Sequence, residues 1–285
     1  MASDGEELIH GDCRQVLPTF GDAGFRLIYI DPPFNSGKRQ RRRTLETVAD
    51  QGDGDRTGFG GRRYRSRLIG ELSFADSFDD YLGFIEGPLR EAHRLLDERG
   101  TLYVHLDYRE AHYVKLLLDE IFGRERFLNE IIWAYDFGGR SKRRWPAKHD
   151  TILVYVKDPE QYHFDPEAVD REPYMAPGLV GAEKAARGKL PTDVWWHTIV
   201  PTSGSEKTGY PTQKPEGVLR RIVAASSAEG DRCLDFFAGS GTLGAVAREL
   251  GRPFVLVDSS AEAIAVIRRR LGLEPRRLTA DADVA

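Results

Sequence analysis

Cysteine is scarce in this sequence: Cys13 and Cys233 are its only two thiols in 285 residues. Two thiols that lie so far apart in the chain supply neither a disulfide framework nor a set of metal ligands. This usage suits a reducing compartment, so we expect a cytoplasmic protein. Neither cysteine follows a proline, and we expect both to be small buried residues rather than nucleophiles.

Long apolar runs and an excess of positive charge are also missing. No run of apolar residues approaches the length that spans a membrane, and the first residues carry no signal pattern, so we expect no membrane partner. The net charge is −4, which excludes a uniformly basic surface. Hydrophobic residues make up 40% of the chain and charged residues 30%, enough for a large core in one α/β domain.

Apolar strand patterns alternate with amphipathic helix patterns along the chain. We predict strands near 6–10, 25–30, 101–106, 128–135, 151–156, 232–236 and 253–257. We predict helices near 79–97, 108–122, 215–227, 242–250 and 260–271. This alternation predicts an α/β fold with a mostly parallel sheet and helices on both faces. The runs 131–133 and 152–156 are expected to form an antiparallel edge strand pair.

Asp31-Pro32-Pro33-Phe34 directly follows the strand-like run 25–30. The two prolines fix the backbone and remove two N–H donors. The Asp31 carboxylate and the Pro32 carbonyl can then converge on a small group with two N–H bonds, such as an exocyclic amine. Phe34 offers a flat face on which a base can stack. The alternative is a rigid Pro-Pro turn that caps a buried strand.

Residues 231–244 join a short apolar strand, a glycine-rich turn and a helix that begins near Thr242. Gly239 and Gly241 allow positive φ and a close approach of the backbone to a ligand. Taken alone, the run 239–244 fits a dinucleotide fingerprint, with Asp258 as the acid that binds a ribose. This region by itself therefore leaves both NAD and S-adenosylmethionine open as cofactors.

Together these segments resemble the permuted β group of DNA amino-methyltransferases, which methylate adenine N6 or cytosine N4. The tetrapeptide comes first in the chain and the glycines come last, as in that group, and the resemblance covers roughly 6–37, 72–157 and 211–270. It implies a Rossmann-like methyltransferase domain over 1–275. The resemblance leaves 158–205 unassigned, and we interpret 158–210, which is rich in Pro, Gly and charged residues, as a variable DNA-recognition insertion within that domain. A tail is expected at 276–285.

The resemblance also implies the roles of individual residues. The catalytic set is Asp31, Pro32, Pro33 and Phe34. The set that binds S-adenosyl-L-methionine is Asp12, Thr212, Gln213, Lys214, Pro215, Asp235, Phe236, Phe237, Ala238, Gly239, Ser240, Gly241, Thr242 and Asp258. In that set, 212–215 close over the methionine end of the cofactor, Asp258 binds the ribose, and Asp12 lies near the adenine. No metal site is expected, and His105 is expected to be a hydrogen-bonded structural residue.

Two local clusters of positive charge predict contacts with double-stranded DNA. Residues 38–67 contain ten Lys or Arg against four acids, and their low apolar content predicts a mobile basic loop over 38–71. A second cluster surrounds Trp145. Such patches neutralise phosphates, although an ordinary solvated loop is the alternative for each. The candidate DNA-binding residues are Lys38, Arg39, Arg41, Arg42, Arg43, Arg140, Lys142, Arg143 and Arg144.

The expected activity is methyl transfer to the exocyclic amine of a base flipped out of duplex DNA. Asp31 favours adenine N6, since serine is common at this position in the cytosine enzymes, and cytosine N4 is the alternative. An NAD-dependent oxidoreductase is supported only by the glycine fingerprint, and a catalytically silent DNA-binding module is a further alternative. The sequence leaves open the recognition site, a homodimer and a cognate restriction endonuclease.

Overall fold

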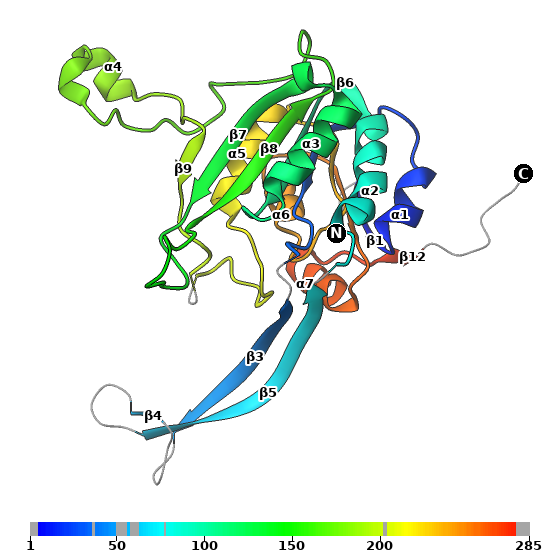
Figure 1. The fold of residues 1–285 in the computed structure, drawn as a ribbon, viewed down its shortest axis with the longest axis vertical. Coiled ribbons are helices and arrows are strands. Elements are labelled where there is room, and N and C mark those ends of the chain that lie inside the picture. The colour runs from blue at the N-terminus through cyan, green and yellow to red at the C-terminus, as the bar shows by residue number, and fades with distance from the viewer. Residues whose placement is uncertain are drawn as a thin grey trace, which may run out of the picture. The chain divides into compact units, whose positions relative to one another are not determined.

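The computed structural model describes residues 5–35, 38–49, 56–57, 63–76, 78–201 and 204–277 (Figure 1). The chain divides into two compact units. One unit comprises the residues up to Phe34 together with those from Asp80 onward, and the other comprises Asn35–Asp79. In the described part, no helix is long and apolar enough to cross a membrane.

The first unit is built on a nine-stranded sheet among the described residues, in the order β12-β1-β11-β10-β2-β6-β8-β7-β9. Strand β8 runs antiparallel to both of its neighbours, β6 and β7, and all other pairs in this sheet are parallel. The strands are β1 (Glu6–His10), β2 (Phe25–Ile30), β6 (Leu96–Leu106), β7 (Phe127–Ala134), β8 (His149–Val156), β9 (Val194–Trp196), β10 (Cys233–Asp235), β11 (Phe254–Asp258) and β12 (Arg276–Arg277).

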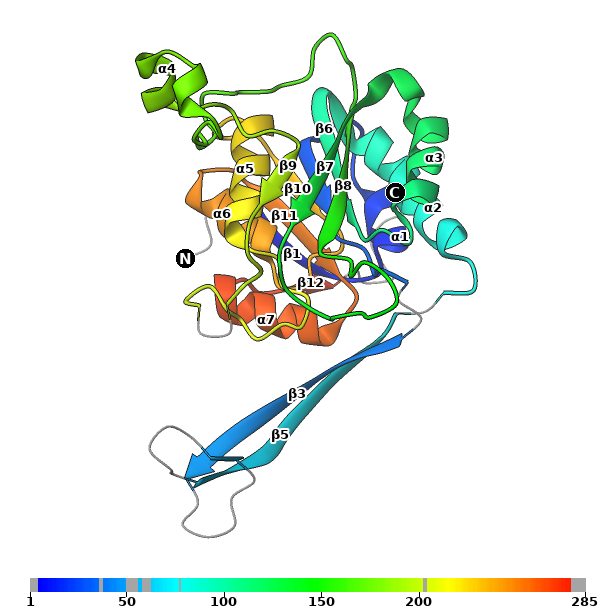
Figure 2. The same ribbon diagram turned by 60° about the vertical axis from the view of Figure 1, so that its left-hand side comes forward.

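Helices cover both faces of this sheet (Figure 2). Helices α1 (Cys13–Val16), α2 (Tyr81–Leu95) and α3 (Ala111–Phe122) pack on one face. Helices α5 (Glu216–Ser226), α6 (Thr242–Glu249) and α7 (Ala261–Leu271) pack on the other, where apolar residues of α5 and α6 join the strands in one buried core. The shorter helices are α4 (Ala182–Arg187), η1 (Leu17–Thr19), η3 (Arg124–Arg126) and η4 (Pro177–Leu179).

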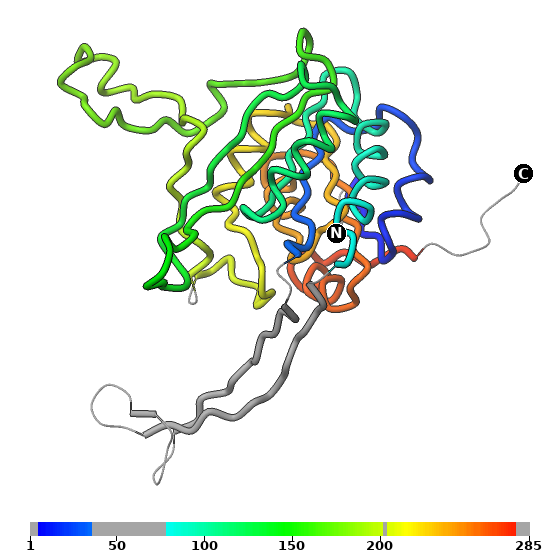
Figure 3. Tube along the Cα trace, viewed as in Figure 1, coloured from blue at the N-terminus to red at the C-terminus, as the bar shows by residue number. Residues whose placement is uncertain are grey.

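The strand directions bring distant parts of the sequence to one edge of the sheet. Asp31 follows β2, while Asp235 and Asp258 end β10 and β11, so the three carboxylates lie at the carboxyl edge of parallel neighbours. Because β8 is reversed, the 135–148 loop between β7 and β8 reaches this same edge. The tube trace shows this loop and the segment that leads to α5 at the same end of the sheet (Figure 3). Open α/β sheets bind their ligands at this edge.

The second unit is an antiparallel ribbon. Strands β3 (Lys38–Ala49) and β5 (Arg63–Asp76) pair from Lys38↔Asp76 to Ala49↔Tyr64, and the short β4 (Arg56–Thr57) pairs with β5. The prediction of a loop over 38–71 is therefore wrong for the backbone. Low apolar content argues against a core, but adjacent antiparallel strands satisfy their backbone groups by pairing with each other. The side chains of Lys38, Arg39, Arg41, Arg42 and Arg43 lie outside the described residues, and their mobility and DNA contacts stay predictions.

The structure confirms the predicted strands and helices of the first unit within a few residues. It also adds elements in segments that carried no such prediction. Strand β9 lies outside β7 and brings Trp195 into the core, because residues 158–193 return the chain to that edge. Strand β12 pairs with β1 at the start of the expected tail, and an isolated bridge joins Glu172 to Lys189 within the expected recognition insertion.

A glycine near the start of α6 sets how closely this helix approaches the sheet. A Cβ on Gly244 would lie 2.7 Å from Leu256, 2.9 Å from Phe254 and 3.0 Å from Leu271. We expect Gly244→Ala to lower the free energy of unfolding by about 1–3 kcal/mol, because the packed core must shift to admit the methyl group. Urea denaturation measures this. Gly139→Ala, with open space around its Cβ, is the control and should stay within about 0.5 kcal/mol of the native protein. Equal effects of the two changes would contradict the packing argument.

Candidate active site

The Asp31 carboxylate is held by a lysine from a distant part of the chain. Lys214 Nζ forms an ion pair with Asp31 Oδ2 across 183 positions of sequence. The other carboxylate oxygen, Oδ1, is buried and has no hydrogen-bond partner among the described residues. A buried acceptor left without a donor costs about 1–3 kcal/mol. Asp31 Oδ1 is therefore a position at which a ligand donor is expected.

The aromatic end of the tetrapeptide contacts a cation and an imidazole. Lys214 Nζ lies 4.7 Å from the centre of the Phe34 ring. His105 stacks against Phe34, with ring centres 6.2 Å apart and an interplanar angle of 30°. Pro32 is buried, whereas Phe34 is partly exposed. The tetrapeptide is thus fixed in place, with one ring accessible from outside.

A chain of buried hydrogen bonds fixes the His105 ring on both of its nitrogens. Tyr29 Oη lies 2.9 Å from His105 Nδ1, and His105 Nε2 lies 3.1 Å from Asp150 Oδ2. Tyr135 donates to Asp150 Oδ1 at 2.9 Å. Burial opposes ionisation of Asp150, but hydrogen bonds from His105 and Tyr135 and the charge of Lys214 hold its pKa below the ordinary value. An ionised Asp150 accepts a hydrogen bond from the N–H at Nε2 of His105, and in that tautomer Nδ1 accepts a hydrogen bond from the Tyr29 hydroxyl.

Two carboxylates at the ends of β10 and β11 hold the glycine turn. Asp235 accepts the Phe237 N–H at 3.0 Å, and Asp258 accepts the N–H groups of Gly239 and Ser260, each at 2.8 Å. Burial raises the pKa of Asp235 well above its ordinary value, while the Phe237 N–H opposes the rise. Burial also raises the pKa of Asp258, against the hydrogen bonds from Ser260 and Gly239. The ends of β10 and β11 therefore carry two carboxyl groups, Asp235 and Asp258, whose ionisation burial makes unfavourable.

The turn itself requires glycine at two positions. Gly239 has φ +51° and Gly241 has φ +71°, a region that side chains with a Cβ rarely adopt. A Cβ on Gly239 would also lie 3.2 Å from Tyr210, and one on Gly241 would lie 3.0 Å from Ile267. These close neighbours are protein atoms, so the turn is packed tightly against the rest of the fold. Its backbone is also engaged within the protein, since the Gly241 N–H donates to Ala238 O at 2.7 Å.

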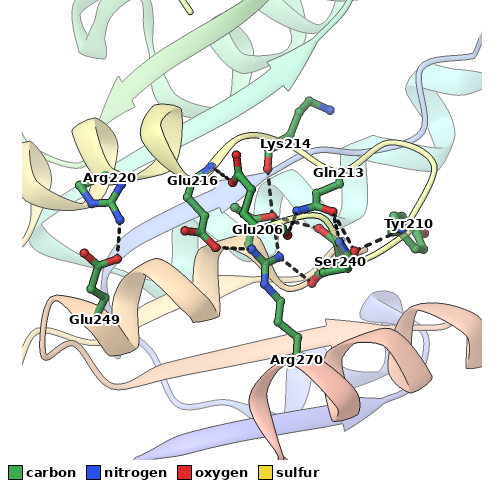
Figure 4. Close-up of polar contacts among 11 residues, drawn as sticks. Glu206, Tyr210, Gln213, Lys214, Glu216, Arg220, Ser240, Glu249 and Arg270 are labelled. Carbon is green, nitrogen blue, oxygen red and sulfur yellow. Dashed lines mark hydrogen bonds and ion pairs between the residues drawn. The ribbon is translucent and has the colours of Figure 1, made fainter. Parts of the chain in front are cut away.

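The start of α5 is tied to this turn through Arg270 of α7 (Figure 4). Arg270 donates to Ser240 O at 3.0 Å, to Thr242 Oγ1 at 3.1 Å and to Glu216 Oε1 at 2.6 Å. Thr242 Oγ1 in turn lies 3.2 Å from Lys214 O, to which it donates. The backbone of Lys214 and the glycine turn therefore form one hydrogen-bonded unit.

The remaining predicted cofactor residues have varied surroundings. The Gln213 side-chain amide bonds to its own segment before α5: it accepts from Thr208 at 2.8 Å and donates to Glu206 O at 2.6 Å. The Phe236 side chain belongs to the core. Asp12 caps α1 and pairs with Arg14 at 2.5 Å, and this contact lowers its pKa. Contact of these residues with a cofactor stays a prediction.

The second basic cluster lies on the exposed 135–148 loop. Arg140, Lys142, Arg143 and Arg144 are exposed, and Trp145 is 95% exposed beside them. The loop is turned by Ser141 Oγ, which accepts the N–H groups of Arg143 and Arg144 at 3.2 Å each. The structure thus places four cations and a large aromatic at the carboxyl edge of the sheet, although their contact with DNA stays a prediction.

Sequence reasoning missed several contacts of this site. It placed Lys214 beside the cofactor and not on Asp31, and it gave no role to Tyr29, Asp150 or Arg270. Asp150 lies near the start of β8, beside the end of the strand that carries His105, but the sequence indicated only the pairing of 152–156 with 131–133. Nothing in the sequence around Arg270 distinguishes it from the neighbouring arginines of α7.

The raised pKa of Asp235 predicts a pH-dependent stability. Since the folded state holds this proton more tightly than the unfolded chain, Asp235 lowers the free energy of unfolding as pH rises above about 3.9. Asp235→Asn keeps an oxygen for the Phe237 N–H and lacks this titration. We expect the variant to gain stability relative to the native protein as pH rises above about 3.9, as measured by urea denaturation at a series of pH values. A difference that does not change with pH would contradict this view of Asp235.

Comparisons with known proteins bear on what such a site does. A family model described as DNA methylase matches residues 25–269. The DNA adenine methyltransferase YhdJ of Escherichia coli is 30% identical over 282 residues, which cover 94% of this chain and 83% of that protein. The type II methyltransferase M.HpaI of Haemophilus parainfluenzae is 30% identical over 269 residues, which cover 94% of this chain and 75% of its own length.

Solved structures share the fold. The crystal structure of the M1.HpyAVI–SAM complex matches with a TM-score of 0.60 and 20% identity, covering 94% of this chain and 99% of that one. At this identity the likeness concerns the fold alone. The family match spans most of the chain and includes both Asp31-Pro32-Pro33-Phe34 and the glycine turn, so the protein belongs to the DNA methylase family of N6- and N4-amino-methyltransferases.

Proposed function

We propose that this protein transfers a methyl group from S-adenosylmethionine to N6 of adenine in double-stranded DNA. The observation that carries the proposal is the Asp31 carboxylate, whose Oδ2 is paired with Lys214 while its buried Oδ1 has no partner among the described residues. Membership of the DNA methylase family supports methyl transfer to DNA. The similarity to a DNA adenine methyltransferase supports adenine over cytosine.

The residues at the carboxyl edge fit this cofactor. Asp258 uses two acceptor positions on backbone N–H groups, and a carboxylate offers about four, so it retains capacity for ribose hydroxyls. Gly239 and Gly241 have no side chains that would block a ligand at the turn. Asp235 ends β10, the strand that leads into the turn and pairs with β11. Asp12 and residues 212–215 complete the proposed cofactor set. When bound, S-adenosylmethionine supplies an electrophilic methyl group on a positively charged sulfur.

The chain's own contribution is to make a weak nucleophile react. The lone pair of an adenine N6 amine is delocalised into the ring. Hydrogen bonds from its two N–H groups, one to Asp31 Oδ1 and one to the Pro32 carbonyl, favour a pyramidal nitrogen whose lone pair is available. Phe34 provides the face against which a flipped-out base stacks. Orientation and electrostatics carry the reaction in this scheme.

Two alternatives raised by the sequence are cytosine N4 methylation and an NAD-dependent oxidoreductase, and they differ in how much support they keep. Cytosine N4 methylation uses the same residues in the same way, and identification of the methylated base separates it from the adenine reaction. The glycine fingerprint that suggested NAD lies here in a chain whose match to the DNA methylase family includes that same turn. An oxidoreductase therefore has no independent support.

A pair of substitutions separates catalysis from cofactor binding. We expect Asp31→Asn to lose methyl transfer by roughly 100-fold or more, while cofactor affinity stays within a few-fold. The substitution removes the negative charge and turns one carboxylate oxygen into an N–H donor, so Lys214 and the substrate amine compete for the single oxygen that remains. We expect Asp258→Ala to weaken cofactor binding by about 10-fold or more, since a hydrogen bond to a charged group is worth about 1.5–3 kcal/mol. Mass spectrometry of nucleosides from treated duplex DNA measures the first, and calorimetry with S-adenosylmethionine measures the second.

Each arm of this experiment has an opposing result. Methylcytosine in place of methyladenine would move the assignment to the N4 reaction, and the absence of both from native-enzyme reactions would overturn the proposed function. Near-normal turnover of Asp31→Asn would contradict the mechanism. Unchanged cofactor affinity in Asp258→Ala would contradict the ribose assignment.

The exposed basic loop predicts a salt-dependent contribution to DNA binding. We expect Arg143→Glu with Arg144→Glu to weaken binding to every duplex and to flatten its salt dependence, with each lost phosphate contact reducing the slope by roughly 0.9. Sequence preference should survive, because phosphate contacts position a protein without reading bases. Arg124→Glu is the control, since this exposed arginine precedes β7 at the opposite edge of the sheet. Titrations at several salt concentrations measure the effect, and an equal loss in the control would refute a role for the loop.

A further inference from the structure

We propose that Lys214 is a positioning residue that fixes the catalytic carboxylate and couples it to the cofactor turn, an inference that rests on the proposed function. The sequence resemblance assigned Lys214 only to the segment that closes over the cofactor. In the structure its ammonium group instead lies on Asp31 and faces the Phe34 ring. Two of the tetrapeptide's functional side chains therefore share one cation.

Burial makes this contact demanding. The Lys214 side chain is only 8% exposed and that of Asp31 16% exposed. An ammonium group buried away from water costs several kcal/mol unless it is paired and hydrogen-bonded. Asp31 supplies the opposite charge, and the face of Phe34 supplies a cation–π contact. The compensation is complete only when both side chains hold their positions, so Lys214 favours one arrangement of the tetrapeptide.

This arrangement selects the oxygen that meets the substrate. Lys214 occupies Oδ2 of Asp31, which leaves Oδ1 as the carboxylate oxygen without a donor in the described part of the chain. Without Lys214, the carboxylate is free to rotate and to present either oxygen. With Lys214 in place, the exocyclic amine meets an acceptor that is already oriented, and no reorganisation is needed in the transition state.

The backbone of the same residue is attached to the cofactor side. Lys214 O accepts from Thr242 Oγ1 at 3.2 Å, and Thr242 is held in turn by Ser240 Oγ at 2.9 Å and by Arg270 at 3.1 Å. Figure 4 shows this junction, with Lys214 above the turn and Arg270 reaching it from α7. A single residue thus contacts the methyl-acceptor side through its ammonium group and the methyl-donor side through its carbonyl. The conformation of Lys214 therefore fixes the position of Asp31 relative to the glycine turn.

The test removes the charge of Lys214 and follows chemistry and binding separately. We expect Lys214→Met to lower kcat about 100-fold, the scale of a misplacement near 1 Å, with the KM for DNA and the calorimetric affinity for S-adenosylmethionine within about 5-fold of the native values. Duplexes with 2-aminopurine at the target position should still report flipping of the base. Lys214→Arg, which keeps the charge and the donors, should recover at least about a tenth of the native kcat.

Controls and opposing outcomes keep the test decisive. Lys157→Met removes another partly buried lysine, which donates to His93 O at 2.6 Å, and should lower stability without changing kcat. If Lys214→Met does not fold, Lys214→Gln removes the charge while keeping a donor. A native enzyme that produces no methylated DNA overturns the proposed function. An active native enzyme overturns this inference alone if the neutral variants keep kcat within about 3-fold, or if their loss lies in cofactor affinity.

Discussion

The pairing of β10 with β2 is the constraint on which the site depends. Cys233 and Leu234 lie beside Leu27 and Ile28 in parallel register, so the last third of the chain enters the sheet next to its beginning. This single junction brings Asp235 and the glycine turn beside Asp31, although about two hundred residues separate them in sequence. The order of the two motifs along the chain therefore does not matter for the site, because the pairing of β10 with β2 places them side by side.

Several features of the site oppose folding on their own. The pKa values of Asp235 and Asp258 are raised by burial, Asp31 Oδ1 lacks a donor in the described structure, and Lys214 is a buried cation. Groups of this kind collect at functional sites, where they are tolerated because the surrounding structure is stable. Here that stability comes from the apolar residues that α5, α6 and α7 bury against the sheet. The site therefore consists of energetically unfavourable buried polar groups that a well-packed core holds in place.

Sequence patterns predicted the framework well and the contacts poorly, for physical reasons. Strands such as β2 and β11 are buried along nearly their whole length, which gives continuous apolar runs that are visible in the sequence. The Asp31–Lys214 pair depends on how two loops meet in space, and periodicity carries no information about that. The ribbon of β3 and β5 was missed because its pairing needs no core, and β9 because three residues are too few for a periodic signal.

The glycine turn shows why a local fingerprint is ambiguous while its surroundings are not. Any ligand with a ribose suits a carboxylate at the end of β11, as Asp258 is placed here. What distinguishes this site is Lys214, whose carbonyl meets the turn and whose ammonium group meets Asp31. A dinucleotide fingerprint requires no such carboxylate across the strand junction.

The reversal of β8 adds the last component. Had β8 been parallel to β7, the connection between them would have crossed the sheet, most often through a helix, and returned at the opposite edge. As an antiparallel neighbour of both β6 and β7, β8 needs only the 135–148 loop, which stays at the carboxyl edge. The exposed cations and Trp145 of this loop therefore lie at the same edge of the sheet as Asp31. A single change of strand direction thus places an exposed, positively charged loop at the carboxyl edge that also carries Asp31.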